Sequence, residues 1–482
     1  MPILSFFGSP RLYALYSGQE RTENYLESSG NTGMSFVRGV YYFVTSLAFS
    51  PVIIGYMYYR GYMQPQPILT LLRYVGYVVL AAFGSRLIGR AMDPQYRQFL
   101  DVWVKASQGD REKQQELKRF DFEIYGVQPD FEAVPNDNLW YLTCEDNQAN
   151  FLVRGLSYYA IHAFGRHMLY PGSLAFLNWL MASNLQAGRR LMVLNKGGQR
   201  AWIKTTEEDL IDAMFIRGNR SPERSQTLVI TCEGNAGFYE IGIANTPAEL
   251  GYSVLGWNQP GFGESSGLPH VRNTLAAAEA IMQYAKSLGF KEENIVLFGW
   301  SIGGFPVSWL AANYPNIRGV ILDATFDDVL PLAASRMPRF LGSIVEYAIR
   351  THANLQIEKI LARYKGPLKL IRRLQEEILI IDDADSTEAT RRATNRGNFL
   401  LKSVLKSRHP ELYEGLEPQV DRWLALSPTE RLMAAGPSES EVARRRRRLY
   451  AACDHYFIDF DSNHVSPLDP GYFNIPELIK EF

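Results

Sequence analysis

Two serines lie at the centre of the pattern G-x-S-x-G, which is typical of the sharp strand-to-helix turn that exposes a nucleophilic serine. One copy is Gly263–Gly267, with Ser265 at its centre, and the other is Gly299–Gly303, with Ser301. The apolar run Ile295–Phe298 precedes the second copy and a helix-compatible stretch follows it, whereas the first copy lies in a polar, glycine-rich segment. We therefore predict Ser301 as a nucleophile and Ser265 as a loop residue.

A serine nucleophile needs a general base, and four histidines follow Ser301 in the chain: His352, His409, His455 and His464. His464 comes directly after the strand-like run Tyr456–Phe460 and its short polar continuation. A loop after the last strand of the sheet is where the order serine, acid, histidine presents its base. We predict His464 as the base, with His455, which precedes that strand, as the alternative.

The acid that orients the imidazole is expected after the next-to-last strand. We predict Leu368–Ile371 as that strand and Glu376, which follows it, as the acid. A second interpretation makes Ile378–Ile381 the strand, and its acid would then be one of three aspartates: Asp382, Asp383 and Asp385. Asp327, in the loop after an earlier predicted strand, is a third candidate. A glutamate can hold the imidazole as an aspartate does.

Acyl transfer builds negative charge on the substrate oxygen, so preorganised N–H donors must face that oxygen. One predicted donor is the backbone N–H of Ile302, the residue after the nucleophile. The second comes from the glycine-rich turn Glu233–Gly237, where the glycines allow the backbone to turn its N–H groups inward. Either Asn235 or Ala236 is the second donor, and the sequence does not decide between them.

The elements around these residues alternate in type after residue 190. Helical stretches are predicted up to about Leu250, over Asn273–Leu288 and up to about Asn313. The predicted strands are Arg200–Thr205, Leu210–Arg217, Thr227–Cys232, Ser253–Trp257, Ile295–Phe298 and Gly319–Leu322. This alternation favours a mostly parallel sheet with helices on both faces, and the order of the site residues favours the α/β-hydrolase fold, an α/β class.

The N-terminal region carries a membrane pattern. Residues Gly39 to Tyr59 contain no charged side chain and are long enough to cross a hydrocarbon core of ~30 Å. A second apolar stretch, Pro67–Ser85, is interrupted by Arg73. We predict a transmembrane hairpin whose connection carries only Arg60, and the greater number of Lys and Arg outside it places both tails in the cytosol.

The predicted domains are a cytosolic tail, the transmembrane hairpin, a helical linker that can lie at the membrane interface, and a hydrolase domain with cap insertions. Their ranges are 1–38, 39–90, 91–190 and 191–482, with the insertions at about 325–365 and 386–450. A third uncharged run, Met168–Gly188, contains several polar groups and would reverse the side of all that follows if it crossed the membrane. We expect a helix at the interface or near the mouth of the site; a buried soluble helix fits equally.

The composition limits the function classes. The chain has 482 residues, with 50 Lys and Arg against 51 Asp and Glu, which gives no electrostatic case for binding nucleic acid. Its three cysteines, Cys144, Cys232 and Cys453, are far apart and lack a metal-binding spacing. We therefore expect no disulfide framework, a reducing compartment, and no metal or organic cofactor.

Several longer runs resemble the phosphatidylserine lipases of the α/β-hydrolase-domain family, subfamily sixteen. They are Cys232–Glu240, Gly251–Asn258, Trp300–Phe305, Leu322–Ala324 and Asn395–Asn398. The resemblance implies an integral membrane lipase of the endoplasmic reticulum that removes one acyl chain from phosphatidylserine, with associated activity on monoacylglycerol. The family nucleophile matches Ser301 and its histidine matches His464. Its acid is an aspartate in an R-R-x-x-D-E context, where this chain has Glu376.

Together these features predict a membrane-bound serine lipase whose partners are a membrane lipid substrate and the bilayer around the hairpin. The alternatives are an acyl-thioesterase or acyltransferase with the same triad, or a catalytically inactive membrane scaffold. Headgroup preference, acyl-position preference and oligomeric state stay open. The arginine run Arg444–Arg448 fits either a solvated helix face or a contact with anionic lipid headgroups.

Overall fold

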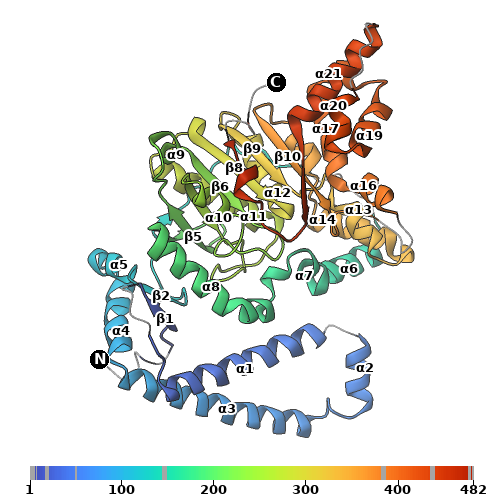
Figure 1. Cartoon of the computed structure of the whole chain (residues 1–482). Coiled ribbons are helices and arrows are strands. Elements are labelled where there is room, and N and C mark those ends of the chain that lie inside the picture. Colours follow the sequence, from blue (N-terminus) through green and yellow to red (C-terminus); the bar gives the residue numbers. More distant parts are fainter. Residues whose placement is uncertain are drawn as a thin grey trace.

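The computed structural model describes residues 6, 8–16, 21–48, 51–143, 149–381, 387–434, 440–475 and 479. Within these ranges, nine strands form one sheet in the order β11-β10-β9-β8-β6-β7-β5-β4-β3 (Figure 1). The strands are β3 Phe131–Glu132, β4 Gln199–Lys204, β5 Leu210–Ile216, β6 Leu228–Cys232, β7 Ser253–Trp257, β8 Ile295–Trp300, β9 Gly319–Asp323, β10 Leu368–Gln375 and β11 Phe457–Asn463.

The sheet is mostly parallel, as predicted. The strands from β7 through β6, β8, β9 and β10 to β11 are paired in parallel, whereas β5 pairs antiparallel with both β4 and β7. Every residue of β6, β7, β8 and β9 is buried, which explains why these strands are nearly continuous apolar runs. The strands predicted before residue 325 agree with β4 to β9 to within two residues at each end.

Helices α11 (Val271–Ser287) and α12 (Gly304–Asn313) agree with two predicted helical stretches and pack against each other beside the sheet. The helix predicted up to Leu250 is wrong over most of its length, because only α10 (Asn245–Glu249) is helical there. The preceding residues form turns. The buried Glu233 carboxylate accepts the backbone N–H groups of Ile243 and Ala244 at 3.0 and 3.2 Å, which takes these donors away from a helix.

Two groups of helices follow β9. The first covers the end of the sheet near Ser301 and consists of α13 (Val329–Ser335) and α14 (Gly342–His352), packed against α6 (Phe151–Ala160). The second lies beyond β10 in Figure 1. Its helices are α16 Glu388–Thr394, α17 Arg396–Arg408, α18 Pro410–Tyr413, α19 Glu417–Ala425, α20 Pro428–Met433 and α21 Glu441–Tyr456, and α15 (Ile357–Leu361) packs between α12 and α17.

The N-terminal part forms a separate layer below the sheet in Figure 1. Its elements are β1 Leu12–Leu15, α1 Tyr25–Ala48, α2 Pro51–Tyr59, α3 Pro65–Met92, α4 Pro94–Ser107, α5 Arg111–Leu117 and β2 Phe120–Phe122. Helices α1 and α3 pack side by side, and α2 links their far ends. In the described part of the chain, α3 is the one helix long and apolar enough to cross a membrane, and it contains the whole predicted second span.

The first predicted span, residues 39–59, is not one continuous helix. Its first part ends α1 at Ala48, and Pro51 begins α2, which runs at a steep angle to α1 in Figure 1. A proline has no N–H to donate and fits best in the first turn of a helix, so Pro51 favours a new helix over a continuation.

The third uncharged run forms part of α8 (Ala175–Lys196), which is preceded by α7 (Arg166–Leu169). One side of α8 packs on the hydrolase domain so closely that a Cβ at Gly188 would lie 2.5 Å from the carbonyl oxygen of Glu240. The opposite side exposes apolar side chains, among them Phe176, Trp179 and Leu180. The described residues of α8 do not form a candidate membrane span.

Candidate active site

Ser301 occupies a strained turn between β8 and α12. Its φ is +54°, in the left-handed region that non-glycine residues rarely adopt. The turn can form only with small neighbours, because a Cβ at Gly303 would lie 2.2 Å from the carbonyl oxygen of Cys232, and one at Gly299 2.9 Å from that of Gly303. This geometry is that of a nucleophile elbow and lifts the Ser301 side chain above the end of the sheet.

Three side chains predicted from distant parts of the sequence meet at this elbow. The Oγ of Ser301 lies 3.0 Å from Nε2 of His464, and Nδ1 of His464 lies 2.8 Å and 3.1 Å from the two carboxylate oxygens of Glu376. All three are buried, with exposed fractions of 4, 5 and 4%. A carboxylate at Nδ1 favours the tautomer with its proton there, which leaves Nε2 free to accept the serine proton.

Glu376 directly follows β10 and is held by backbone donors. One of its oxygens accepts the N–H groups of Ile378 and Leu379 at 2.9 and 3.0 Å. Burial acts to raise the pKa of Glu376, but the hydrogen bond and charge of His464, together with these two N–H groups, outweigh burial and lower the pKa. The carboxylate therefore stays ionised at neutral pH and can stabilise an imidazolium.

The structure rejects the alternative strand and places one other acid candidate, Asp327, with a different partner. Residues 378–381 form bends and coil, so the alternative strand is wrong, and its aspartates at 382, 383 and 385 lie outside the described residues. Asp327 is bound instead by Arg396, whose Nε donates to it at 2.7 Å.

The remaining candidate histidines and Ser265 lie elsewhere. His455 is in α21, where burial and the positive charges of Lys369 and Arg408 lower its pKa to about 4. His409 is bound to Tyr456 and His352 lies in α14, so neither contacts the elbow. The Oγ of Ser265 accepts the N–H of Asp212 at 2.9 Å and donates to the carbonyl of Asn258 at 2.8 Å, so Ser265 is a loop residue as predicted.

The histidine loop is fixed by residues that sequence reasoning did not single out. The backbone N–H of His464 donates to Glu377 at 2.9 Å, and the indole N–H of Trp300 donates to the His464 carbonyl at 3.1 Å. Arg373 pairs with the buried Asp323 and donates to the Ser466 carbonyl at 2.9 Å. The pair Arg372 and Arg373 before Glu376 could have indicated such contacts from the sequence, because charged residues within a buried strand normally have partners.

The predicted oxyanion turn passes directly over the elbow. A Cβ at Gly234 would lie 3.6 Å from Cβ of Ser301, and Asn235 lines the cavities at Ser301 together with Ile302 or Ala236. The Asn235 carbonyl accepts the N–H of Gly172, which ties the turn to the segment before α8. The placement fits either predicted second donor.

Two cavities meet at Ser301. The first, of about 200 Å³, is lined almost entirely by apolar side chains from α6, α7, α13 and α14. The second, of about 260 Å³, lies between the Gly234–Gly242 segment and the His464 loop. The predicted cap segment 325–365 contributes to the first cavity, whereas the described part of 386–450 contributes to neither. Met168 and Leu169 also line the first cavity, which places the start of the third uncharged run in its wall.

No group of three or more His, Cys, Asp or Glu side chains is placed to hold a metal ion within the described ranges. Cys232 and Cys453 are buried free thiols whose pKa values are raised by burial, and Cys144 lies outside the described residues.

Known proteins share both parts of the chain. The profile described as phosphatidylserine lipase ABHD16 N-terminal domain matches residues 1–123, and that of the alpha/beta hydrolase fold matches residues 227–462. A Caenorhabditis elegans protein named "Uncharacterized protein F37A4.1" is 58% identical over 97% of this chain and 97% of its own. Proteins named "Phosphatidylserine lipase ABHD16A" from Bos taurus and Homo sapiens are 34% and 33% identical, over 89% of this chain and 86% of theirs. This chain belongs to the ABHD16 family.

The two matched regions divide this ABHD16 protein along a structural boundary. The N-terminal match covers the layer from β1 to β2, with the apolar helix α3, and the hydrolase match runs from β6 into β11. Ser301 and Glu376 lie inside the second match, and His464 follows its end by two residues. The chain is a hydrolase with an α/β-hydrolase fold.

Proposed function

We propose that this protein is a membrane-bound serine lipase that hydrolyses an acyl ester of glycerophospholipids. Its expected reaction converts phosphatidylserine to lysophosphatidylserine and a fatty acid, with monoacylglycerol as a further substrate. The observation that carries the proposal is the hydrogen-bonded series Ser301, His464 and Glu376 at the inner end of an apolar cavity. The names of the mammalian relatives support the choice of phosphatidylserine.

In the proposed mechanism, Ser301 Oγ attacks the ester carbonyl while His464 Nε2 takes the serine proton. Glu376 holds the imidazole and stabilises its positive charge. The N–H of Ile302 and one from the Asn235–Ala236 turn stabilise the oxyanion. His464 then returns the proton to the leaving alcohol, which is the lysophospholipid. Water, activated by the same histidine, hydrolyses the acyl-enzyme and releases the fatty acid.

The two cavities supply a place for each half of the ester. The apolar cavity matches an acyl chain, because every contact that it offers beyond the elbow is to hydrocarbon, apart from Asn235 and Arg336. The second cavity has the backbone of the glycine-rich turn and the His464 ring in its wall, and we assign the alcohol part to it. A catalytically inactive scaffold would have no need for an aligned series of three buried polar side chains.

The membrane attachment is part of the proposal. Helix α3 is long and apolar enough to cross a bilayer, and apolar side chains such as Leu71, Leu72 and Leu80 are at least 60% exposed on it. Its pairing with α1 supports a hairpin in the membrane. The resemblance places this hairpin in the endoplasmic reticulum, and the excess of Lys and Arg outside it puts the hydrolase domain on the cytosolic side. The partners are then the bilayer and the lipid substrate drawn from it.

Fluorophosphonate labelling and fatty-acid release from phosphatidylserine vesicles test this function in the detergent-solubilised full chain. Wild type and Ser265→Ala should label and release fatty acid, whereas Ser301→Ala should do neither. Ser265→Ala is a matched control, because it removes the same hydroxyl from the other G-x-S-x-G copy. Folding of each variant is checked by thermal unfolding. A folded wild type that neither labels nor releases fatty acid would overturn the proposal.

A further inference from the structure

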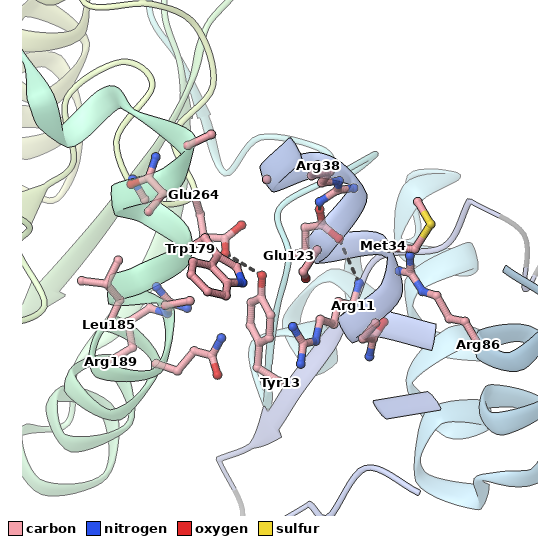
Figure 2. Close-up of a pocket in the computed structure, with 18 residues that line it drawn as sticks. Arg11, Tyr13, Met34, Arg38, Arg86, Glu123, Trp179, Leu185, Arg189 and Glu264 are labelled. Atoms are coloured by element: carbon pink, nitrogen blue, oxygen red, sulfur yellow. Dashed lines mark hydrogen bonds and ion pairs between the residues drawn. The ribbon is translucent and has the colours of Figure 1, made fainter. Parts of the chain in front are cut away.

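A third cavity, of about 290 Å³, lies at the junction between the N-terminal layer and the hydrolase domain, and we call it the junction pocket. It shares no lining residue with the cavities at Ser301. Figure 2 shows Tyr13 and Glu123 at its centre, Met34 and Arg86 on one side, and Trp179 with Leu185 reaching in from α8 on the other. The pocket thus combines a charged interior with an apolar wall.

Four arginines and two glutamates line the junction pocket, and their existing partners differ. Arg189 is fully engaged, with Asp121 at 3.0 Å and Glu240 at 2.6 Å, and Arg11 is paired with Glu23 at 3.0 Å. One lining carboxylate, Glu264, accepts the Tyr13 hydroxyl at 2.8 Å and the N–H of Ile124 at 3.2 Å. These charged groups already have hydrogen-bond or ion-pair partners within the protein.

Among the described residues, the two remaining arginines have fewer partners. Arg38 of α1 is 59% exposed along its side chain and makes one ion pair within the described ranges, to Glu123 at 3.3 Å. Arg86 of α3 donates one long hydrogen bond, 3.4 Å, to the Ser9 carbonyl, and its buried Nε has no partner among the described residues. An exposed ion pair is weak, and Glu123 also accepts the backbone N–H of Arg11 at 3.3 Å, so Arg38 can leave it at little cost.

The position of the pocket along the helices indicates what could bind there. Arg38 is the last charged residue before the uncharged run that begins at Gly39, and Arg86 is the first charged residue after the apolar stretch that ends at Ser85. Both cations therefore lie at the boundary between charged and uncharged surface on paired helices. In a membrane-inserted hairpin this boundary is the level of the lipid headgroups, where Arg side chains meet phosphates.

The catalytic cavities lack such groups. Of the residues lining the two cavities at Ser301, Arg336 alone carries a permanent charge, and its guanidinium is occupied by the carbonyls of Leu332 and Ile378. Of these three cavities, the junction pocket is therefore the one suited to a phosphate held by paired guanidinium groups.

We propose that the junction pocket is a second lipid site, which binds the phosphate of an anionic glycerophospholipid between Arg38 and Arg86. The glycerol part lies against Met34, Trp179 and Leu185, and the acyl chains continue along the apolar surface of α1 and α3. The proposal rests on the membrane attachment of the proposed function and uses none of the Ser301 chemistry.

Lipid binding by the full-length Ser301→Ala protein tests the proposal, because this variant cannot hydrolyse lipid and the test does not depend on the triad. Native mass spectrometry of the detergent-solubilised protein measures retention of phosphatidic acid, phosphatidylcholine and, in a competition arm, inorganic phosphate. The test variants add Arg38→Gln alone or Arg38→Gln with Arg86→Gln. The matched control adds Arg97→Gln, an exposed arginine of the adjacent α4 outside the pocket.

We expect phosphatidic acid to bind at least tenfold more tightly than phosphatidylcholine. Arg38→Gln should weaken it severalfold and the double variant at least tenfold, with less than a twofold change for Arg97→Gln. Equal retention in the double variant and the control would overturn the proposal, as would equal affinity for the two lipids. Displacement of the lipid by inorganic phosphate at equal concentration would assign the pocket to free phosphate and would also overturn it. Because Arg38 is exposed, its single variant keeps the test valid if the double variant does not fold.

Discussion

The cavity at Ser301 and the junction pocket are built in opposite ways. The first is lined almost entirely by apolar side chains, and Ser301 in its wall begins the series of hydrogen bonds to His464 and Glu376. The second is lined by six charged side chains, of which two arginines lack a full set of partners in the described part of the chain. A glycerophospholipid has apolar acyl chains and a charged headgroup. The apolar cavity at Ser301 matches the first, and the junction pocket matches the second.

The two regions also differ in how the chain assembles them. Each catalytic side chain lies at the end of a strand of one sheet: Ser301 after β8, Glu376 after β10 and His464 after β11. The junction pocket draws on β1, α1, α3, the segment after β2, α8 and the loop at Gly263. A catalytic site placed on a single sheet is held rigidly, whereas a pocket shared by two layers depends on how these layers pack.

The largest expected effect is at the base. His464→Ala should lower kcat/KM for phosphatidylserine by about 10³-fold or more, because no other described histidine reaches Ser301. His455→Ala is the matched control, since that ring lies in α21 away from the elbow, and its activity should change less than threefold. Initial rates of fatty-acid release measure both. If His455→Ala lost as much activity as His464→Ala, the assignment of the base to His464 would be wrong and His455 would take its place.

A smaller loss is expected at the acid. Glu376→Gln should reduce kcat by about 10²- to 10³-fold, because an amide keeps the shape but cannot stabilise the imidazolium. Glu376→Asp keeps the charge on a shorter side chain and should recover at least a tenth of the wild-type rate. A pH–rate profile of wild type, Glu376→Gln and Glu376→Asp distinguishes the effect of losing the carboxylate charge from the effect of changing the side-chain length. If Glu376→Gln kept the wild-type rate, the acid would have to come from another segment.

Much of the catalytic site was predictable because its signals are local in the sequence. The strand before Ser301 and the helix after it distinguished Ser301 from Ser265. Glu376 was identified by its position directly after a buried strand. The pairing of Arg373 with Asp323 was not predictable, because it joins two neighbouring strands whose order in the sheet the sequence does not state. The packing of side chains across strands is a tertiary property.

The N-terminal layer has features that hydropathy and charge patterns in the sequence did not predict. The uncharged run 39–59 has the length of a span, yet Pro51 begins a separate helix there, and hydropathy alone does not report that break. The meeting of Arg38 and Arg86 depends on the packing of α1 against α3, and Tyr13 reaches Glu264 across 251 residues of sequence. Contacts of that separation carry no periodic signal, so the junction pocket was visible only in the structure.

The apolar character of the catalytic cavity can be tested by filling it. Ala348 of α14 is buried in its wall, so Ala348→Phe should lower activity on long-chain esters by about 10- to 100-fold and leave acetyl ester hydrolysis within about threefold. Ala334→Phe is the control, because that alanine of α13 is exposed and outside the lining. Rates over a series of acyl chain lengths measure the effect. An equal loss for acetyl and long-chain esters would show damage to the elbow and would assign the acyl chain elsewhere.

The smallest effect is expected at the arginine run 444–448, and it tests whether positive charge alone explains lipid contact. These residues lie on α21, which Figure 1 places at the far end of the molecule from α1 and α3. Arg445 is also engaged, since it donates to the Glu414 carbonyl.

Replacing the exposed Arg444 and Arg448 with Gln should therefore change phosphatidic acid retention less than twofold, although it removes as much charge as the Arg38 and Arg86 double variant. The same retention assay compares the two double variants directly. A tenfold loss in the α21 variant would mean that anionic lipid follows the overall positive charge of the surface. A loss confined to the Arg38 and Arg86 variant would mean that the geometry of the junction pocket selects the anionic lipid. Charges more than a Debye length of about 8 Å from the lipid are screened, so distant arginines should contribute little.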